Sequence, residues 1–236
     1  MGESTQVIAI DGPVAAGKTT VGRELARRLG LNYLDTGVMY RAITWLALRR
    51  KVSIADEAGL GQLAQESTIR LTGRDGGTVL ICGEQVGPEL WEPKVVRNVS
   101  RVARVPEVRR ALVEQQRALA AEGRMVMVGR DIGTVVLPDA DLKLFITASA
   151  EVRAHRRWQE LRDQGQDPDF DQVLEETRER DRIDSQRADS PLIPAEDAVL
   201  VETDDLSAEQ VTDLIIQQVR EQVQKQTQLN SGSGQN

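Results

Sequence analysis

Short, almost continuous apolar runs alternate along the chain with longer segments whose apolar positions recur at helical spacing. Apolar runs of this length are typical of strands that are buried on both faces of a parallel sheet. Strand patterns occupy residues 7–10, 32–34, 125–128, 142–146 and 198–201. Helical patterns occupy residues 18–29, 38–48, 93–120, 151–162 and 169–183, and a last one begins at Ser207. The alternation predicts an α/β fold with a doubly wound parallel sheet flanked by helices.

The segment from Thr68 to Gly87 breaks this alternation. Apolar and polar positions alternate over residues 69–71 (IRL), residues 79–81 (VLI) form a short apolar run, and glycines separate the two. Period-two alternation interrupted by glycine turns indicates short hairpins. We therefore expect a small β-rich insertion in the α/β framework. Farther along, Pro106 predicts either a break in the helical region or the first turn of a new helix.

A glycine-rich motif follows the first predicted strand and opens the first predicted helix. Residues 12–19 fit the pattern G-x-x-x-x-G-K-[ST] of phosphate-binding loops. In such a loop, backbone N–H groups and the N-terminus of the following helix face an anion. Lys18 would reach the β- and γ-phosphates of a nucleoside triphosphate, and the Thr19 hydroxyl would bind Mg²⁺. The predicted ATP-binding residues of the loop are Gly12, Pro13, Val14, Ala15, Ala16, Gly17, Lys18, Thr19 and Thr20.

Composition narrows the classes of ligand. The chain of 236 residues has a net charge of −7, which argues against a surface built for a nucleic-acid polymer or an anionic membrane. Arginines nevertheless cluster locally, which fits a small phosphorylated ligand. No apolar stretch approaches the ~18 residues of a membrane helix, and the N-terminus lacks a signal-peptide core. Cys82 and His155 are the only residues of their types, so we expect a cytoplasmic protein without histidine-based metal sites or catalytic triads.

Arg180, Asp184 and Arg187 are spaced at i, i+4 and i+7, which is one face of a continuous helix. Such a face is either a group of side chains that project into a ligand site or a salt-bridged surface in solvent. The spacing by itself favours the solvated surface.

Further motifs follow the phosphate-binding loop. They are residues 35–41 (DTGVMYR), 98–100 (NVS), 106–109 (PEVR), 129–136 (GRDIGTVV), 180–187 (RDRIDSQR) and 190–192 (SPL). The series resembles the bacterial cytidylate kinases, a family of P-loop nucleoside monophosphate kinases, from Val7 to about Val219. The phosphate-binding loop is shared by many families, whereas the segments 35–41 and 129–136 are far more specific.

The resemblance implies a P-loop NTPase fold and transfer of the γ-phosphoryl group of ATP to CMP or dCMP, with Mg²⁺ as cofactor. It also implies a monomer whose partners are these small molecules, without a nucleic-acid polymer or a membrane. A single domain, residues 1–236, would combine a core, a β-rich insertion that binds the monophosphate, and a helical lid. The expected bounds are 5–65, 100–152 and 170–225 for the core, about 66–99 for the insertion, about 153–169 for the lid and 226–236 for a disordered tail.

The resemblance also implies roles for individual residues. The implied catalytic residues are Lys18, Arg130, Arg180 and Arg187. The implied CMP-binding residues are Thr36, Tyr40, Arg41, Ser100, Arg109, Arg130, Asp131, Arg180, Asp184 and Arg187. Within this set Arg41 and Arg130 would hold the CMP phosphate, and Asp184 the ribose. On the lid, Arg153 and Arg157, with Arg156 beside them, would contact ATP phosphates, and Thr19 would bind Mg²⁺ together with phosphates and water.

The chemistry of the base agrees with these assignments. Cytosine offers an amino donor at N4 and acceptors at N3 and O2, whereas uracil reverses two of the three. A carboxylate accepts from N4, and an arginine or a hydroxyl donates to N3 and O2. Asp131, Arg109 and Ser100 have these chemical types. UMP would leave their donors and acceptor unpaired in a closed site, which is costly.

Some positions depart from the family pattern or carry alternatives. Val128 stands where relatives often have an acidic residue, so a carboxylate near Mg²⁺ is missing unless Asp35 supplies it. Trp91 stands where relatives often have arginine, and packing within the insertion is favoured over stacking on a base. Thr203 and Asp204 are the expected wall of the adenine pocket. The rival functions are a kinase of AMP, UMP, dTMP or shikimate, and a nucleotide-dependent switch, which would lack the acceptor arginines.

Overall fold

The structure is a computed structural model that describes residues 6–73 and 77–219. Five parallel strands form the central sheet in the order β2-β6-β1-β7-β8. Their bounds are Val7–Asp11 (β1), Asn32–Asp35 (β2), Met125–Val128 (β6), Leu142–Thr147 (β7) and Val199–Glu202 (β8). Strand β1 is central; the chain passes from it to the edge strand β2, returns to β6 between these two, and then adds β7 and β8 on the other side. The predicted doubly wound parallel sheet is therefore confirmed.

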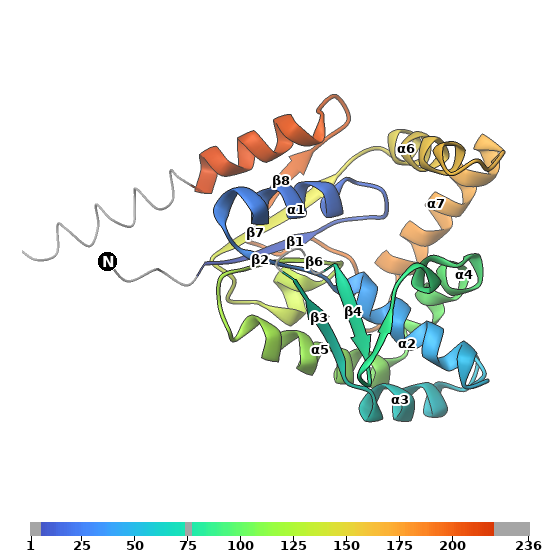
Figure 1. The fold of residues 1–236 in the computed structure, drawn as a ribbon. Helices are drawn as coiled ribbons and strands as arrows, with labels where there is room; N and C mark the ends of the chain where they lie inside the picture. Colours follow the sequence, from blue (N-terminus) through green and yellow to red (C-terminus); the bar gives the residue numbers. More distant parts are fainter. Residues whose placement is uncertain (1–5, 74–76, 220–236) are drawn as a thin grey trace, which may run out of the picture.

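Helices cover both faces of the sheet (Figure 1). Helix α1 and the helix of residues 208–219 lie on one face, and α2, α3 and α5 lie on the other. The helix bounds are Lys18–Leu29 (α1), Thr36–Arg49 (α2), Glu57–Glu66 (α3), Pro93–Val102 (α4), Pro106–Ala120 (α5), Ala150–Asp163 (α6) and Phe170–Ser185 (α7).

The position of strand β6 between two layers of helices explains why its sequence is apolar without interruption. Met125 and Met127 pack into the cluster of α2, α3 and α5, whereas Val126 and Val128 pack into the cluster of α1. All four side chains are buried. Because successive side chains of a strand point to opposite faces, a strand covered on both sides needs apolar residues at every position.

Local signals in the sequence account for the helix ends. Helix α1 has the predicted bounds and ends at Gly30, whose φ of 66° is left-handed and whose N–H donates to the Ala26 carbonyl. Pro106 opens α5 as its first residue, so the helical region 93–120 is two helices. The last helix is capped reciprocally, since Ser207 and Gln210 each accept from the backbone N–H of the other.

The predicted hairpins form a separate antiparallel sheet of three strands. Its strands are β3 (Ile69–Thr72), β4 (Thr78–Ile81) and β5 (Glu84–Val86). Cys82 and Gly83 have φ values of 51° and 85° and form the tight turn between β4 and β5. The short 3₁₀ helix η1 (Pro88–Trp91) then leads into α4.

Helix α3 is absent from the predicted elements because Gly59 and Gly61 lower its helix propensity. Packing explains the second glycine. A Cβ at Gly61 would lie 2.5 Å from Cβ of Glu107, so the glycine allows α3 to approach α5 closely. Asp56 caps α3 by accepting a hydrogen bond of 3.0 Å from the Gly59 N–H.

Helices α6 and α7 form a two-helix arm next to the carboxyl ends of the sheet strands (Figure 1). The expected lid, residues 153–169, comprises most of α6 and the loop to α7. The expected tail, residues 226–236, lies outside the described residues. Within the described parts of the chain, no helix combines the length and apolar character that crossing a membrane requires.

Candidate active site

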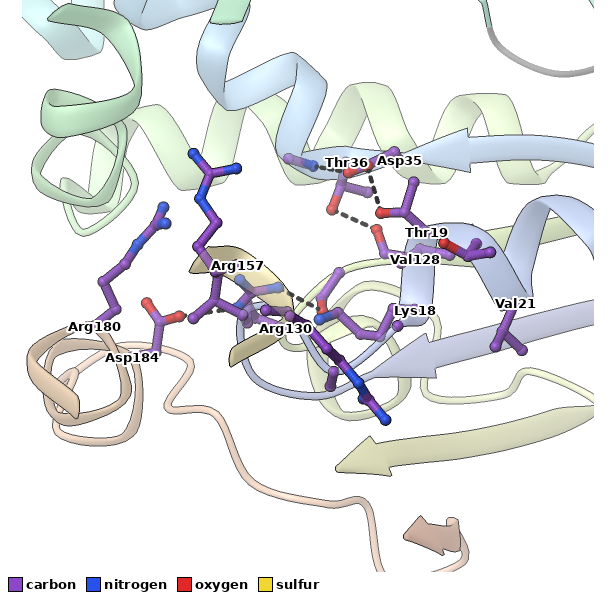
Figure 2. A pocket seen from close by; sticks show the side chains of 18 of the residues that line it. Lys18, Thr19, Val21, Asp35, Thr36, Val128, Arg130, Arg157, Arg180 and Asp184 are labelled. Atoms are coloured by element: carbon purple, nitrogen blue, oxygen red, sulfur yellow. Dashed lines mark hydrogen bonds and ion pairs between the residues drawn. The ribbon is translucent and has the colours of Figure 1, made fainter. Parts of the chain in front are cut away.

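A cavity of about 750 Å³ opens at the carboxyl ends of β1, β2 and β6. The loop between β1 and α1 forms part of its wall, together with α2, α4, α6, α7 and residues 203–211. Figure 2 shows Arg130, Arg157 and Arg180 across this cavity from Thr19 and Asp35. Ligands of open α/β sheets bind at this edge, beside the strand where the chain reverses its winding direction.

The glycine-rich loop is pressed against the neighbouring strand β7. Gly12 has a φ of 146°, and a Cβ at this position would lie 1.9 Å from the carbonyl oxygen of Ile146. Gly17 has a φ of 91° and is the N-cap residue of α1. Both glycines are therefore required by the backbone itself. The loop delivers Lys18 and Thr19 to the first turn of α1, where unpaired N–H groups favour an anion.

Replacing Gly12 by alanine should destabilise the protein strongly. We expect G12A to lower the free energy of unfolding by about 4 kcal/mol, because backbone strain adds to a steric overlap that the strand cannot relieve. The matched control is G165A, where φ is 79° but no atom lies within 4 Å of the added Cβ. Its expected loss is about 1 kcal/mol from backbone strain alone. Urea unfolding of both variants measures the difference, and equal losses would contradict the close approach.

Lys18 is buried, and its Nζ donates to the carbonyl oxygen of Pro13. Burial holds the pKa of the Lys18 ammonium well below its usual value, and the nearby Arg130 guanidinium lowers it further. The ammonium form of Lys18 is therefore poorly stabilised in the free protein. Phosphate oxygens would supply the missing negative charge.

Thr19 and Asp35 bring hard oxygen ligands together at the N-terminus of α1. The Thr19 hydroxyl donates to Oδ2 of Asp35 at 3.2 Å, and Oδ1 of Asp35 accepts from the Gly37 N–H at 2.9 Å (Figure 2). Among the described residues, no group of three or more acidic, histidine or cysteine side chains is positioned to hold a metal. Mg²⁺ needs no such cage, because it binds through one or two protein oxygens together with phosphates and water. The pair fits Mg²⁺.

Asp11, which is not among the predicted site residues, holds the segment that carries Arg130 and Asp131. Its two carboxylate oxygens accept from the Ile132 and Gly133 N–H groups at 2.8 and 2.7 Å. These amides open the π-helical turn η2 (Ile132–Val136). Burial raises the pKa of Asp11 to about 6, against the two hydrogen bonds. An acidic residue at the end of the first buried strand was the available signal.

Arg109 and Asp131 form a buried ion pair at one end of the cavity. Arg109 Nη2 donates to Oδ2 of Asp131, and the two residues are 2% and 4% exposed. Arg109 Nη1 also donates to the Tyr40 hydroxyl at 3.3 Å. Burial raises the pKa of Asp131, and the charge of Arg109 opposes this shift. Both residues line the cavity with Tyr40, and Ser100 lines it from α4.

Asp184 links two of the predicted arginines. Arg130 Nε donates to its Oδ2 at 2.8 Å, and Arg187 Nη2 donates to its Oδ1. Burial alone would raise the pKa of Asp184, but these two guanidinium groups hold it below its usual value. The expected continuous helical face is wrong in one respect, since α7 ends at Ser185 and Arg187 follows it in the next segment. Arg180, Asp184 and Arg187 nevertheless line one cavity.

Arg41 and Arg180 line the same cavity but take part in no ion pair within the described ranges. Burial lowers the pKa of both guanidinium groups, that of Arg180 to about 10. Nη1 of Arg41 is buried without a hydrogen-bond partner. Half-buried cations without a counter-charge are costly, so their retention here points to an anionic ligand. Thr36 also lines the cavity, and its hydroxyl donates to the Val128 carbonyl at 3.0 Å.

The three arginines at the start of the arm have different surroundings. Arg157 lines the cavity and pairs with Glu160 at 3.0 Å. Arg156 also lines it and donates to the Thr203 hydroxyl at 3.1 Å. Arg153 does not belong to the described lining of the cavity. Its guanidinium makes a two-pronged ion pair with Asp181, at 2.9 and 2.6 Å.

Of the two residues expected to form the wall of the adenine pocket, Thr203 lines the cavity and Asp204 is not in its described lining. Thr203 lines the cavity together with Leu206, Ser207, Ala208 and Val211. Asp204 instead accepts from the Ser149 hydroxyl and N–H at the start of α6. The apolar residues of this wall were not predicted to line the site, because they lie at the start of the last helix and their periodicity is that of core positions.

Known proteins are similar in sequence to this chain over nearly its whole length. The chain matches the cytidylate kinase family over residues 8–221. A cytidylate kinase of Caldanaerobacter subterraneus is 48% identical over 92% of this chain and 95% of its own. One of Pelotomaculum thermopropionicum is 50% identical over 90% and 95%. An uncharacterised protein of Eubacterium ventriosum, 13% identical, shares the fold with a TM-score of 0.52 over 92% of this chain and 99% of its own.

The family match and the two relatives agree with the P-loop NTPase fold, with its glycine-rich loop between β1 and α1. The match includes residues 35–41 and 129–136, which lie at the ends of β2 and β6. The chain belongs to the cytidylate kinase family.

Proposed function

We propose that this protein transfers the γ-phosphoryl group of ATP to CMP and dCMP, giving ADP and CDP or dCDP. One observation carries the proposal: a single cavity contains a phosphate-binding loop and, separately, a group of half-buried arginines beside the buried Arg109–Asp131 pair. A nucleotide switch needs the loop but has no use for a second anion site. Two phosphorylated substrates need both.

Charge neutralisation is the main chemical task of such a site. The donor and the acceptor are both anions and repel each other, and the acceptor phosphate needs no strong general base. Arg41, Arg130 and Arg180 offer planar guanidinium groups that can each hold two oxygens. Lys18 would hold the transferring group from the opposite side. The protein then contributes in two ways: it aligns the two phosphates, and it places positive charge around the phosphoryl group that is transferred.

The Arg109–Asp131 pair gives the site a preference for cytosine. Asp131 would accept from the N4 amino group, and Arg109 and Ser100 would donate to N3 and O2. Uracil would turn its O4 toward a carboxylate, and this mismatch in a closed site is costly. Asp184 would accept from the ribose 3′-hydroxyl, which CMP and dCMP share.

Thr19 and Asp35 are the residues that would hold Mg²⁺. When bound, the ion supplies positive charge at the phosphate oxygens of ATP. Thr19 is fixed by its place in the first turn of α1, and Asp35 by its cap on α2. Binding of Mg²⁺ in this proposal thus does not need an acidic residue at position 128, where this chain has valine.

The α6–α7 arm would serve as the lid. Arg157 would leave Glu160 and contact ATP phosphates, and closure would exclude water and suppress hydrolysis of ATP. We assign Arg153 a structural role at the base of the arm, in place of the expected ATP contact, because its guanidinium is bound to Asp181. Every group that the reaction needs comes from one chain, so a monomer suffices, and cytoplasmic nucleotides are the expected substrates.

An assay of ADP release tests the function. With ATP and Mg²⁺, we expect rapid turnover on CMP and dCMP, and a kcat/KM for UMP at least about tenfold lower, since one mismatched hydrogen-bonding edge is worth about 1–3 kcal/mol. AMP and shikimate should give no turnover. EDTA should abolish the turnover on CMP and dCMP. A higher kcat/KM for UMP or AMP would overturn the base assignment. Absence of acceptor-stimulated ADP release would overturn the kinase assignment.

A further inference from the structure

Trp91 carries a feature that the proposed reaction has not used. It ends η1, directly after the antiparallel sheet, and its side chain is 53% exposed although it lines the cavity. The preceding residue, Leu90, is only 1% exposed and anchors the turn in the core. A large apolar ring held in this position by a buried neighbour is not explained by packing within the insertion.

The indole ring of Trp91 stacks on Arg41. The Cζ atom of Arg41 lies 3.9 Å from the ring centroid, the shortest of the arginine–aromatic contacts in the described parts of the chain. An aromatic ring attracts a guanidinium placed over its face without using the N–H groups as hydrogen-bond donors, so these groups stay available to a ligand. Nη1 of Arg41 is buried without a hydrogen-bond partner. The ring therefore fixes the plane of Arg41 and leaves its donors to a ligand.

We propose that Trp91 is a positioning residue that orients Arg41 toward the phosphate of the acceptor nucleotide. The inference rests on the proposed function, in which Arg41 binds that phosphate. A free arginine side chain would lose conformational entropy on gripping a phosphate, and a stacked one has lost much of it beforehand. Trp91 thus contributes to acceptor binding without touching the acceptor.

The test compares Michaelis constants for the two substrates in W91A. We expect KM for CMP to rise about tenfold while KM for ATP changes less than twofold, since cation–π stacking at a partly buried site is worth this factor. W91F keeps a ring and should restore most of the affinity. The matched control is W45A, because Trp45 stacks on Arg49 at 4.9 Å and is not among the described residues lining the cavity. It should leave KM for CMP within twofold.

A double-mutant cycle separates positioning from general damage. R41A should raise KM for CMP, and W91A should add less than twofold in the R41A background, because the ring then has nothing to orient. Additive effects, an unchanged KM for CMP in W91A, or equal effects on CMP and ATP would overturn the inference. An unchanged KM for CMP in R41A itself would instead overturn the acceptor site of the proposed function. Thermal unfolding of each variant verifies that it is folded.

Discussion

Replacing Lys18 by methionine is expected to lower kcat at least about 1000-fold and, at the same time, to stabilise the folded protein. The loss of rate follows because Lys18 is the cation that the loop places at the phosphates. The gain in stability follows because burial lowers the pKa of Lys18, so the folded state carries an ammonium that is poorly solvated. Methionine keeps the length of the side chain without the charge. We expect a melting temperature a few degrees higher.

The pH dependence of this stabilisation has a definite sign. Below the lowered pKa of the folded state, Lys18 is protonated in both states, and the penalty is fully present. Between that pKa and the ordinary value of 10.5, only the unfolded chain binds the proton, so the stability of the wild type rises with pH. The advantage of K18M over the wild type should therefore shrink as the pH approaches 10. Urea unfolding at a series of pH values measures it.

Lys143 provides the control for K18M. Its side chain is 10% exposed and pairs with Asp197 at 2.9 Å, away from the described lining of the cavity. We expect K143M to leave kcat unchanged and to lower stability by less than about 1 kcal/mol. A K18M variant that keeps substantial activity, or one that is less stable than the wild type at neutral pH, would contradict the role given to Lys18.

The second large effect is expected for D131N, which should reduce the preference for CMP over UMP at least about 100-fold. Arginine has only N–H donors, so the amide oxygen of the new asparagine must face Arg109. Its NH₂ group is then left facing the base. This donor suits O4 of uracil and opposes the N4 amino group of cytosine. The ratio of kcat/KM for the two nucleotides measures the change.

Stability provides a second readout of the Arg109–Asp131 pair. D131N leaves Arg109 buried without a compensating charge, and we expect a loss of about 3 kcal/mol in the free energy of unfolding. The double variant R109M/D131L removes both charges and should recover that stability while remaining inactive. The matched control is D181N, which breaks the two-pronged pair with Arg153. It should lower stability but leave the CMP preference unchanged, whereas an equal loss of preference would show that D131N acts through misfolding.

Much of the fold could be predicted because its signals are local. The apolar runs of β1, β6 and β7 and the Lys18–Leu29 helix follow from strand burial, glycine ends and helical spacing. Helix α3 could not be predicted, because Gly61 is explained by the approach of a distant helix. Such a contact is invisible until the fold is known.

The candidate site likewise contains residues that could be predicted from local sequence signals and residues that could not. The phosphate-binding loop and the motif residues Arg130 and Asp131 are recognisable by their residue types and order. Asp11 was missed because it acts on two backbone N–H groups that are far away in the sequence. The structural role that we propose for Arg153 could not be predicted for a related reason. Its partner Asp181 lies on the next helix, and no local pattern distinguishes a paired arginine from a free one.

The surroundings of Arg153 have a consequence for how the arm can move. Its guanidinium joins the carbonyls of Val14 and Ala148 to Asp181, so three segments of the chain are fastened at one buried point. These hydrogen bonds of Arg153 connect the base of the arm to the phosphate-binding loop. If the arm serves as the proposed lid, we expect it to open by a swing of the distal part of α6 and α7 about this point. Nucleotides would then enter and leave while the loop keeps its shape.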